Sequence, residues 1–436
     1  MKHKWLFLVI PLLILFLVIE GFFLKIDLEK IAEKENNPSR LPVMNISLHD
    51  TSLEEITSHS KDIKYEGNDL ELSFDDTVLN FSNVEIKGRG NSTWSARKKP
   101  FQIKFDSKVD LFGFGARKKY ILLANAYDDS FIRNALMFKM TEMIKKEYSE
   151  VGRFIELYID DEYQGLYYLT TKVEIGKAAV DLRDKYGILI ELDTLHRAYE
   201  ECIEEIEVEC LIVKDAVYED DEEILTEAVS DFARDFSILV RAAKRGDFRR
   251  VSEVIDVESF AEYFLISEFA VNPDAYVSSF YFYKNGKKDK IHAGPMWDYD
   301  FAFSNRNWDW NRYDGSFFSP TESLVQRKDV FIEENEDSDT RKFMYYLFDM
   351  PEFRAEVERI FRDKLSGRGL ELEKWTFELA ASIKDAALKD IKYWRDDEEL
   401  YLKDVKYLLS WLRARFDYFE QEYGREKEWI FRPGVI

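Results

Sequence analysis

The stretch FIELYIDDEYQGLYYLT, residues Phe154–Thr170, decides the fold class of this chain. Two apolar runs, Phe154–Ile159 and Tyr163–Thr170, lie on either side of the polar group Asp160-Asp161-Glu162. Short apolar runs separated by such a polar group are typical of two strands joined by a turn. The stretch therefore predicts an antiparallel β-hairpin.

Similar short runs fill the chain on both sides of this hairpin and predict further strands. They are Val43–Leu48, Leu70–Phe74, Val84–Lys87, Phe101–Phe105, Tyr120–Ala124 and Gly187–Leu192. One helix is expected among them, from about Asp129 to Lys146, because apolar residues recur there at steps of four. The first half of the chain is therefore expected to be rich in β-structure.

The second half has a helical pattern. Apolar residues at helical spacing predict helices over Glu223–Ala243, Val257–Val271, Phe353–Leu365, Lys374–Tyr393 and Asp404–Tyr423. A hairpin is expected between them, with strands Ser278–Lys284 and Lys290–Pro295 that turn at Asn285-Gly286. A β-rich half followed by a helical half predicts an α+β, two-lobed domain, with a β-rich lobe over residues 41–195 and a mainly helical lobe over residues 196–436.

The N-terminal residues predict a membrane segment. The basic start Met1–Lys4 precedes the apolar stretch Trp5–Leu24, which is about one bilayer crossing long. Basic residues on the N-terminal side favour a single-pass anchor over residues 1–24, a polar stalk over residues 25–40 and a C-terminal domain outside the cytoplasm. A cleaved signal peptide is the alternative and gives the same location.

Composition excludes several classes of function. The 436 residues carry a net charge of -23, which argues against nucleic-acid binding and against broad adhesion to anionic lipid. Five scattered His give no zinc-ligand spacing. Cys202 and Cys210 are too few for a disulfide framework, and one hairpin disulfide or two free thiols remain equally open.

A basic island lies within this acidic chain. Residues 87–119 hold ten Lys and Arg against two Asp, and they include the turn Lys87-Gly88-Arg89-Gly90-Asn91. Glycines let backbone N–H groups approach a phosphate, and Arg89, Lys99 and Lys104 could neutralise it. The island predicts an anion site, with an ordinary solvated surface as the alternative.

Three carboxylates stand in apolar surroundings in the second half. Asp274 ends an apolar helical run just before an expected strand, and Asp298 and Asp300 are ringed by aromatic residues. A strand there would direct Asp298 and Asp300 to one face. Two such carboxylates favour a Mg²⁺ or Mn²⁺ site, and the alternative is that one caps a turn and the other pairs with an Arg.

The order of these segments resembles the spore-coat-protein-H (CotH) kinase-like family. The matching blocks lie between about Leu41 and Tyr423 and read IKGRGNSTW…KKPFQIKF, LLANAYDDSFIRNAL, YQGLYYLTTKVE, LIELD, FLISEFAVNPDAYVSSFYFYK and AGPMWDYDFAFSN. The resemblance implies an atypical protein-kinase-like fold, and some members of the family transfer phosphate from ATP to Ser residues of proteins. With the membrane segment, the expected fold class is a two-lobed kinase-like α+β domain behind one transmembrane helix.

The resemblance also implies roles for single residues. Asp274 resembles the base that accepts the proton of a substrate hydroxyl, and Asp298 resembles the metal-binding aspartate, with Asp300 beside it. Ser279 stands where protein kinases have a metal-binding Asn. The residues implied to hold ATP are Arg89, Gly90, Asn91, Lys104 or Lys99, and Glu174, which would orient the lysine. Arg133 and Asn134 would fix the interface between lobes or reach the substrate.

Three functions follow as hypotheses. The leading one is an ATP- and metal-dependent phosphotransferase that modifies hydroxyl side chains of surface or coat proteins. The second is a non-catalytic, pseudokinase-like scaffold for cell-envelope or spore-coat assembly. The third keeps the metal and the acids but transfers a nucleotidyl or another phosphate-containing group.

Overall fold

The computed structural model describes residues 41–193, 211–305, 319–325, 339–395, 397 and 399–424. The strands are β1 Val43–Ser47, β2 Tyr65–Phe74, β3 Thr77–Gly88, β4 Phe101–Val109, β5 Arg117–Leu123, β6 Gly152–Ile159, β7 Glu162–Thr171, β8 Ile188–Leu192, β9 Leu211–Ala216, β10 Phe280–Lys284 and β11 His292–Ala293. The helices are α2 Leu53–Ser58, α3 Arg133–Met143, α4 Glu222–Lys244, α5 Phe248–Val254, α6 Val257–Ala270, α8 Asp339–Asp349, α9 Pro351–Ile360, α10 Gly369–Trp394 and α11 Glu399–Glu422. A 3₁₀ turn, Ser92–Ser95, and a π-helical turn, Phe361–Leu365, complete the elements.

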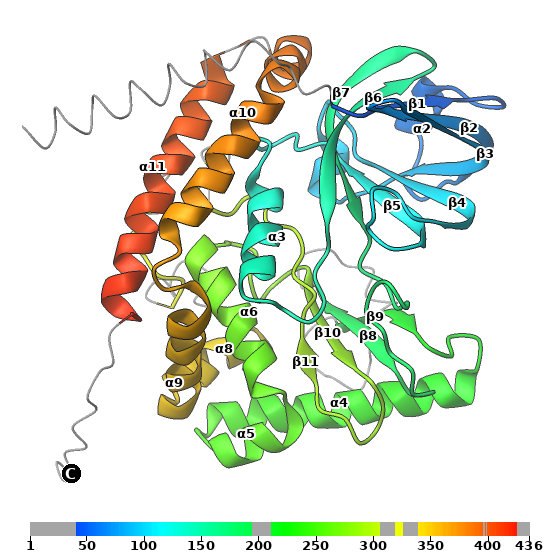
Figure 1. Cartoon of the computed structure of the whole chain (residues 1–436). Coiled ribbons are helices and arrows are strands. Elements are labelled where there is room, and N and C mark those ends of the chain that lie inside the picture. Colours follow the sequence, from blue (N-terminus) through cyan, green and yellow to red (C-terminus); the bar gives the residue numbers. More distant parts are fainter. Residues whose placement is uncertain are drawn as a thin grey trace, which may run out of the picture.

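Seven strands close into a barrel in the order β1-β2-β3-β4-β5-β7-β6 (Figure 1). Closure comes from a parallel pairing of β1 with β6, which joins segments more than a hundred residues apart, from Val43↔Glu156 to Ile46↔Ile159. Alternate residues of each strand point inward, and their apolar side chains fill the barrel. The inward residues include Ile46, Leu72, Ile86, Ile103 and Leu157.

The predicted hairpin Phe154–Thr170 is confirmed as β6 and β7. Its turn residues Asp160 and Asp161 have φ of 50° and 63°, as a tight hairpin turn requires. Their carboxylates also contact β1, because the Leu48 N–H donates to Asp160 at 2.7 Å and the Asn45 amide donates to Asp161 at 2.6 Å. The turn therefore helps to hold β1 in the barrel.

A second, four-stranded sheet has the order β11-β10-β8-β9 and lies below the barrel in Figure 1. Helices α4 and α6 lie beside this sheet, while the long helices α10 and α11 run side by side along the left of the view. Helix α3 leaves the barrel and packs against α6 and α10. The N-terminal half of the chain therefore supplies one helix, α3, and two strands, β8 and β9, to the second body.

Two apolar cores correspond to these two bodies. The smaller core fills the barrel, and the larger lies among the helices and the four-stranded sheet. The outer face of β5, β6 and β7 belongs to the larger core through Ile121, Phe154 and Tyr168. Tyr168 stacks on Phe138 of α3, which in turn contacts Trp297, so the barrel is packed directly against the segment that carries Asp298.

The predicted fold class is corrected by this structure. The chain is α+β, but its β-rich part is a closed seven-stranded barrel rather than one lobe of a two-lobed kinase-like domain behind a membrane helix. Barrel closure rests on the distant β1–β6 pairing, which local sequence patterns do not reveal. The expected domain boundary at residues 195 and 196 stays a prediction.

The predicted single-pass membrane location is also corrected. Within residues 41–424, as far as the structure describes them, no helix is long and apolar enough to cross a membrane. The longest helices, α10 and α11, are amphipathic, with one buried face and one charged, exposed face. The expected segment 1–24 and its stalk 25–40 lie outside the described residues, as do Cys202 and Cys210.

Candidate active site

Asp274 lies in a tight turn between α6 and β10. Helix α6 ends at Ala270 because Val271 adopts a left-handed conformation, with φ of 45°. The Asp274 N–H donates to the Asn272 side chain at 3.3 Å, and the Asp274 carbonyl accepts from Val277 and Ser278. The turn is thus held by the backbone of Asp274 and not by its carboxyl, which is half-buried. After the turn the chain enters β10.

Asp298 and Asp300 follow β11 in an irregular segment. The conditional expectation of a strand is wrong here, because residues 294–303 form none and Asp298 has φ of 68°. Asp298 is consequently exposed while Asp300 is buried. The Ser279 hydroxyl donates to the Asp298 carboxylate at 3.4 Å, and the Asn272 amide donates to the Asp298 carbonyl at the same distance. The Asp274 turn and the Asp298 segment are thus linked.

These carboxylates interact electrostatically. Burial, then Asp298, then Asp193 raise the pKa of Asp274 to about 7. Burial, followed by Asp298 and Asp274, raises the pKa of Asp300 well above its ordinary value. Since like charges disfavour ionisation only at short range, Asp274, Asp298 and Asp300 lie near one another. That they form one functional site stays a prediction.

Asp193 is a fourth carboxylate at this site, and sequence reasoning did not single it out. It follows β8 directly and accepts a hydrogen bond from the Ser278 hydroxyl at 3.0 Å. A carboxylate that directly ends a fully buried apolar strand is the signal that could have identified it. Its place beside Asp274 depends on the pairing of β8 with β10.

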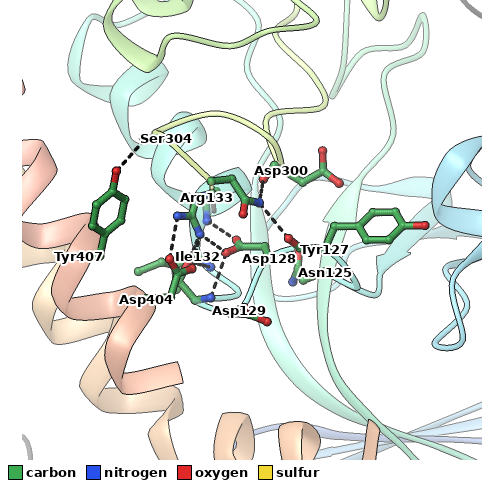
Figure 2. A network of polar contacts seen from close by, with 12 residues as sticks. Asn125, Tyr127, Asp128, Asp129, Ile132, Arg133, Asp300, Ser304, Asp404 and Tyr407 are labelled. Atoms are coloured by element: carbon green, nitrogen blue, oxygen red, sulfur yellow. Dashed lines mark hydrogen bonds and ion pairs between the residues drawn. The ribbon is translucent and has the colours of Figure 1, made fainter. Parts of the chain in front are cut away.

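The segment 125–134 supports the loop that carries Asp300 (Figure 2). The Asn134 side chain accepts from the Tyr299 N–H at 2.8 Å, and Tyr127 stacks on Phe301 with ring centroids 5.8 Å apart. The Asn305 amide donates to the carbonyls of Tyr127 and Asp300. This loop is therefore fixed on both sides of Asp300.

Arg133 is the centre of this support, and it is fully buried. Its guanidinium donates to Asp128, to Asp404 of α11 at 2.5 and 3.1 Å, and to the Ala302 carbonyl at 3.1 Å. Burial alone lowers the pKa of Arg133, but Asp404 and Asp128 together outweigh burial and raise it. Figure 2 shows Arg133 between α11 and the Asp300 loop, which favours the expected interface role over contact with a substrate.

Arg89 faces the carboxylates from the barrel. It follows the last residue of β3, and its guanidinium lies 5.3 Å from the Trp297 ring centroid. Burial lowers the pKa of Arg89, whereas Asp298, Tyr281, Glu191 and Asp300 act to raise it. The predicted anion-binding arginine therefore stands next to the predicted metal-binding aspartates.

The glycine turn next to Arg89 has the conformation that the sequence suggests. Gly90 has φ of 81°, and a Cβ there would clash with the Thr93 hydroxyl. Lys61, which sequence reasoning missed, donates to the Gly90 carbonyl at 2.7 Å and to the exposed Asn91 side chain at 2.5 Å. Lys61 thereby fixes the turn and adds a positive charge to it.

The two candidate phosphate lysines differ in position. Lys99 folds back onto its own loop, where it donates to the Trp94 carbonyl at 2.6 Å. Lys104 lies on the outer face of β4 and pairs with Glu85 at 3.5 Å. Glu174 lies 3.7 Å from Lys119 rather than beside Lys104. The structure therefore brings neither Lys99 nor Lys104 together with Glu174.

A metal site is not preformed in the described residues, since no three His, Cys, Asp or Glu there are close enough to hold an ion. The chemistry of the donors nevertheless fits a divalent cation. Burial, and then the charges of neighbouring aspartates, raises the pKa of Asp274 and Asp300, and a bound cation would favour their charged forms. Carboxylate oxygens are the ligands that Mg²⁺ and Mn²⁺ prefer.

The basic turn at Arg89 thus lies near the carboxylates of Asp298 and Asp300, between the β-barrel and the helical body. The chain belongs to the CotH kinase family, because the family model described as CotH kinase protein matches residues 86–419, most of its length. The resemblance drawn from the sequence blocks is thereby confirmed. No curated protein matches the chain.

Proposed function

We propose that this chain is a metal-dependent phosphotransferase that takes phosphate from ATP and passes it to a hydroxyl side chain of a protein. The observation that carries the proposal is the convergence of Asp274, Asp298 and Asp300 opposite Arg89. Phosphoryl transfer needs positioned acids, neutralised phosphate oxygens and a base for the attacking hydroxyl. These residues supply all three requirements.

Asp274 is the residue proposed to accept the proton of the acceptor hydroxyl. A general base works best when its pKa lies near the working pH, and burial with Asp298 and Asp193 raises the pKa of Asp274 to about 7. Its carboxyl is half-buried, and it is not held by the turn in which it lies. It is therefore ionised in a large share of molecules near neutral pH and can take up the proton.

Asp298 and Asp300 are proposed to hold Mg²⁺ or Mn²⁺, with Ser279 beside them. Bound there, the cation would neutralise phosphate oxygens of ATP. The Ser279 hydroxyl already contacts Asp298, which places it where it can orient that carboxylate. Arg89, at the edge of the same site, would bind a phosphate oxygen, and the turn at Gly90 and Asn91 would offer further donors.

A scaffold without catalysis is the second candidate. It is favoured by the finding that the described carboxylates are not close enough together to hold a metal as they stand. Ser279 also replaces the amide that supports a second metal in protein kinases. Under this function the site would bind neither nucleotide nor metal, and the surface alone would matter.

The test uses ATP labelled on either the γ- or the α-phosphate, with Mg²⁺ or Mn²⁺, the purified chain and a Ser-rich protein acceptor. The proposal predicts transfer of the γ-label alone, and its loss in Asp298→Asn. The exposed Asp385→Asn serves as the matched control and should retain transfer. Transfer of the α-label would indicate a nucleotidyltransferase. If no label is transferred and no nucleotide binds, the scaffold replaces the proposal.

A further inference from the structure

Three lysines stand in a row across neighbouring strands of the barrel. Lys104 of β4 is directly opposite Lys119 of β5. Tyr120 of β5 is opposite Thr171, the last residue of β7, so Lys172 directly follows the end of this ladder, beside Lys119. Since adjacent strands lie about 4.8 Å apart, the row extends over about 10 Å. Residues directly opposite each other point to the same face of a sheet.

The face that carries the row is turned toward the second body. Ile121 and Tyr168, two and four residues from Lys119 and Lys172 on the same strand faces, are buried in the larger core. From the four-stranded sheet, Lys214 and Asp215 of β9 act on the Lys172 ammonium. The Ile175 N–H, just after Lys172, donates to Asp215 at 2.7 Å. The row therefore lies along the junction of the barrel and that sheet.

Like charges directly opposite each other on adjacent strands destabilise a sheet. Two members of this row have loose partners, Glu85 at 3.5 Å from Lys104 and Glu174 at 3.7 Å from Lys119. These separations exceed an ordinary N–H···O distance, so the three N–H donors of each ammonium are largely left for another ligand. Their side chains are about one third exposed, which leaves them accessible.

Of the three lysines, Lys172 has the positive charge that nearby carboxylates balance least. Across the described stretches of the chain, no carboxylate lies within ion-pair distance of its ammonium. Burial, then the positive charge of Lys119, lowers the pKa of Lys172 to about 8, while Glu174 and Asp215 act in the opposite direction and Lys214 lowers it further. A half-buried ammonium in such surroundings gains more from an anionic ligand than a solvated one does.

The row is continuous with the basic turn at Arg89. Lys214 also acts on Lys61, which holds the Gly90-Asn91 turn, and so do Lys87 and Arg89. Lys214 itself pairs with Glu191 at 2.7 Å, next to Arg89 and Tyr281. Positive groups therefore follow one another from the lysine row to the site of Asp298.

We infer that the lysine row Lys104–Lys119–Lys172 binds the phosphate chain of the nucleotide donor, with Lys172 as its main anchor. A row of several cations fits a ligand with several successive charges better than a single carboxylate. The identity of the ligand as a nucleotide rests on the proposed function, whereas the binding of a phosphate chain does not.

The test measures binding of inorganic tripolyphosphate by calorimetry without added metal, so that it does not depend on catalysis. Lys172→Met keeps the length of the side chain without its charge and should weaken binding by roughly 10- to 100-fold. Lys119→Met and Lys104→Met should weaken it less. Lys118→Met is the matched control, because Lys118 is exposed and its side chain points to the other face of β5. Its affinity should equal that of the wild type.

A second readout separates a direct contact from a loss of fold. Near about pH 8.5, wild-type binding should take up protons, because an anion favours the charged form of Lys172. This uptake appears as a dependence of the binding heat on the buffer, and Lys172→Arg should bind without it. ATP and a phosphoserine peptide, compared at equal concentration, distinguish a nucleotide from a phosphorylated acceptor. The inference is overturned if the wild type does not bind tripolyphosphate, or if Lys172→Met binds it as tightly as the wild type does. If the phosphopeptide binds more tightly than ATP, the assignment of the ligand as a nucleotide is overturned.

Discussion

The raised pKa of the Asp274 carboxyl, which suits its proposed role as a base, has a cost in stability. Its pKa is raised from 3.8 to about 7 in the folded protein. The folded protein thus binds this proton more tightly than the unfolded chain. The contribution of Asp274 to the free energy of unfolding therefore falls as the pH rises from about 4 to about 7 and stays low above that.

Asp274→Asn should accordingly stabilise the protein at neutral and alkaline pH. Removing a repelled, half-buried charge should raise the Tm by on the order of 2–5 °C near about pH 8, and by less near about pH 5. Thermal unfolding followed by circular dichroism at the two pH values checks this. Asp385→Asn, at an exposed position of α10, should leave the Tm unchanged at both. A lower Tm for Asp274→Asn near pH 8 would show that the carboxylate is not repelled.

Arg133 is the residue whose loss should cost the most stability. Arg133→Met would leave Asp128 and Asp404 buried without their partner, and such uncompensated charges cost about 3–5 kcal/mol. Urea unfolding measures the loss. Arg183→Met removes an exposed pair with Asp181 and should have no measurable effect. Equal effects of the two substitutions would contradict the role given to Arg133.

Helix α11 positions the end of α6, and with it the Asp274 turn. The fully buried Arg415 donates to the carbonyls of Glu268 and Phe269 at the end of α6, and to those of Pro320 and Glu322. Carbonyls at a helix C-terminus have no partner within the helix, so this side chain satisfies them. The Asp274 turn thus depends on an element about 140 residues further along the chain.

Arg415→Met should therefore loosen this region before the rest of the molecule. Hydrogen exchange followed by mass spectrometry should show faster exchange in peptides from residues 268–279 and 319–325. The β2–β3 hairpin, which belongs to the barrel, serves as an internal reference, and its exchange should stay unchanged. Uniformly faster exchange over all peptides would indicate a global loss of stability instead.

Over the whole molecule, the barrel and the helical body are joined by a buried ion pair. Lys98 donates to Asp390 of α10 at 2.6 Å and to the Leu166 carbonyl of β7, and Asp390 also accepts from the Leu166 N–H. Both side chains are almost fully buried. This contact, with the shared core of β5, β6 and β7, should make the two bodies unfold together.

Calorimetry tests this coupling. The wild type should unfold in one transition, whereas Lys98→Met should separate the barrel from the helical body and give two. Lys118→Met, which removes an exposed lysine of the barrel outside this contact, should keep the single transition. Two well-separated transitions in the wild type would mean that the ion pair does not couple the bodies.

The sequence predicted most elements but not their assembly. The spacing of apolar residues predicted the ends of β6, β7, α6 and α10 to within about five residues, because this spacing depends on local sequence alone. The closed barrel could not be predicted, since it depends on the pairing of β1 with β6 between distant segments. The π-helical turn after α9 was likewise included in one expected helix.

For the candidate site, too, the sequence identified single residues but not the neighbours that strand pairing brings to them. Asp298 acts on both Asp274 and Arg89, which the sequence also singled out, since apolar surroundings mark each acid; their joint role stays a prediction. Asp193 and Lys172 were missed because their importance arises from neighbours on other strands. The partner of Glu174 was also not predictable, because strand register places Lys119, and not Lys104, within its reach.

The rate of phosphate transfer from ATP in the wild type and in Asp274→Asn tests the central claim most directly. Asp274→Asn keeps the shape of the side chain but cannot accept a proton, so transfer should fall by at least about 10²-fold while nucleotide binding and the fold persist. An Asp274→Asn variant that stays folded and transfers phosphate at the wild-type rate would contradict the account.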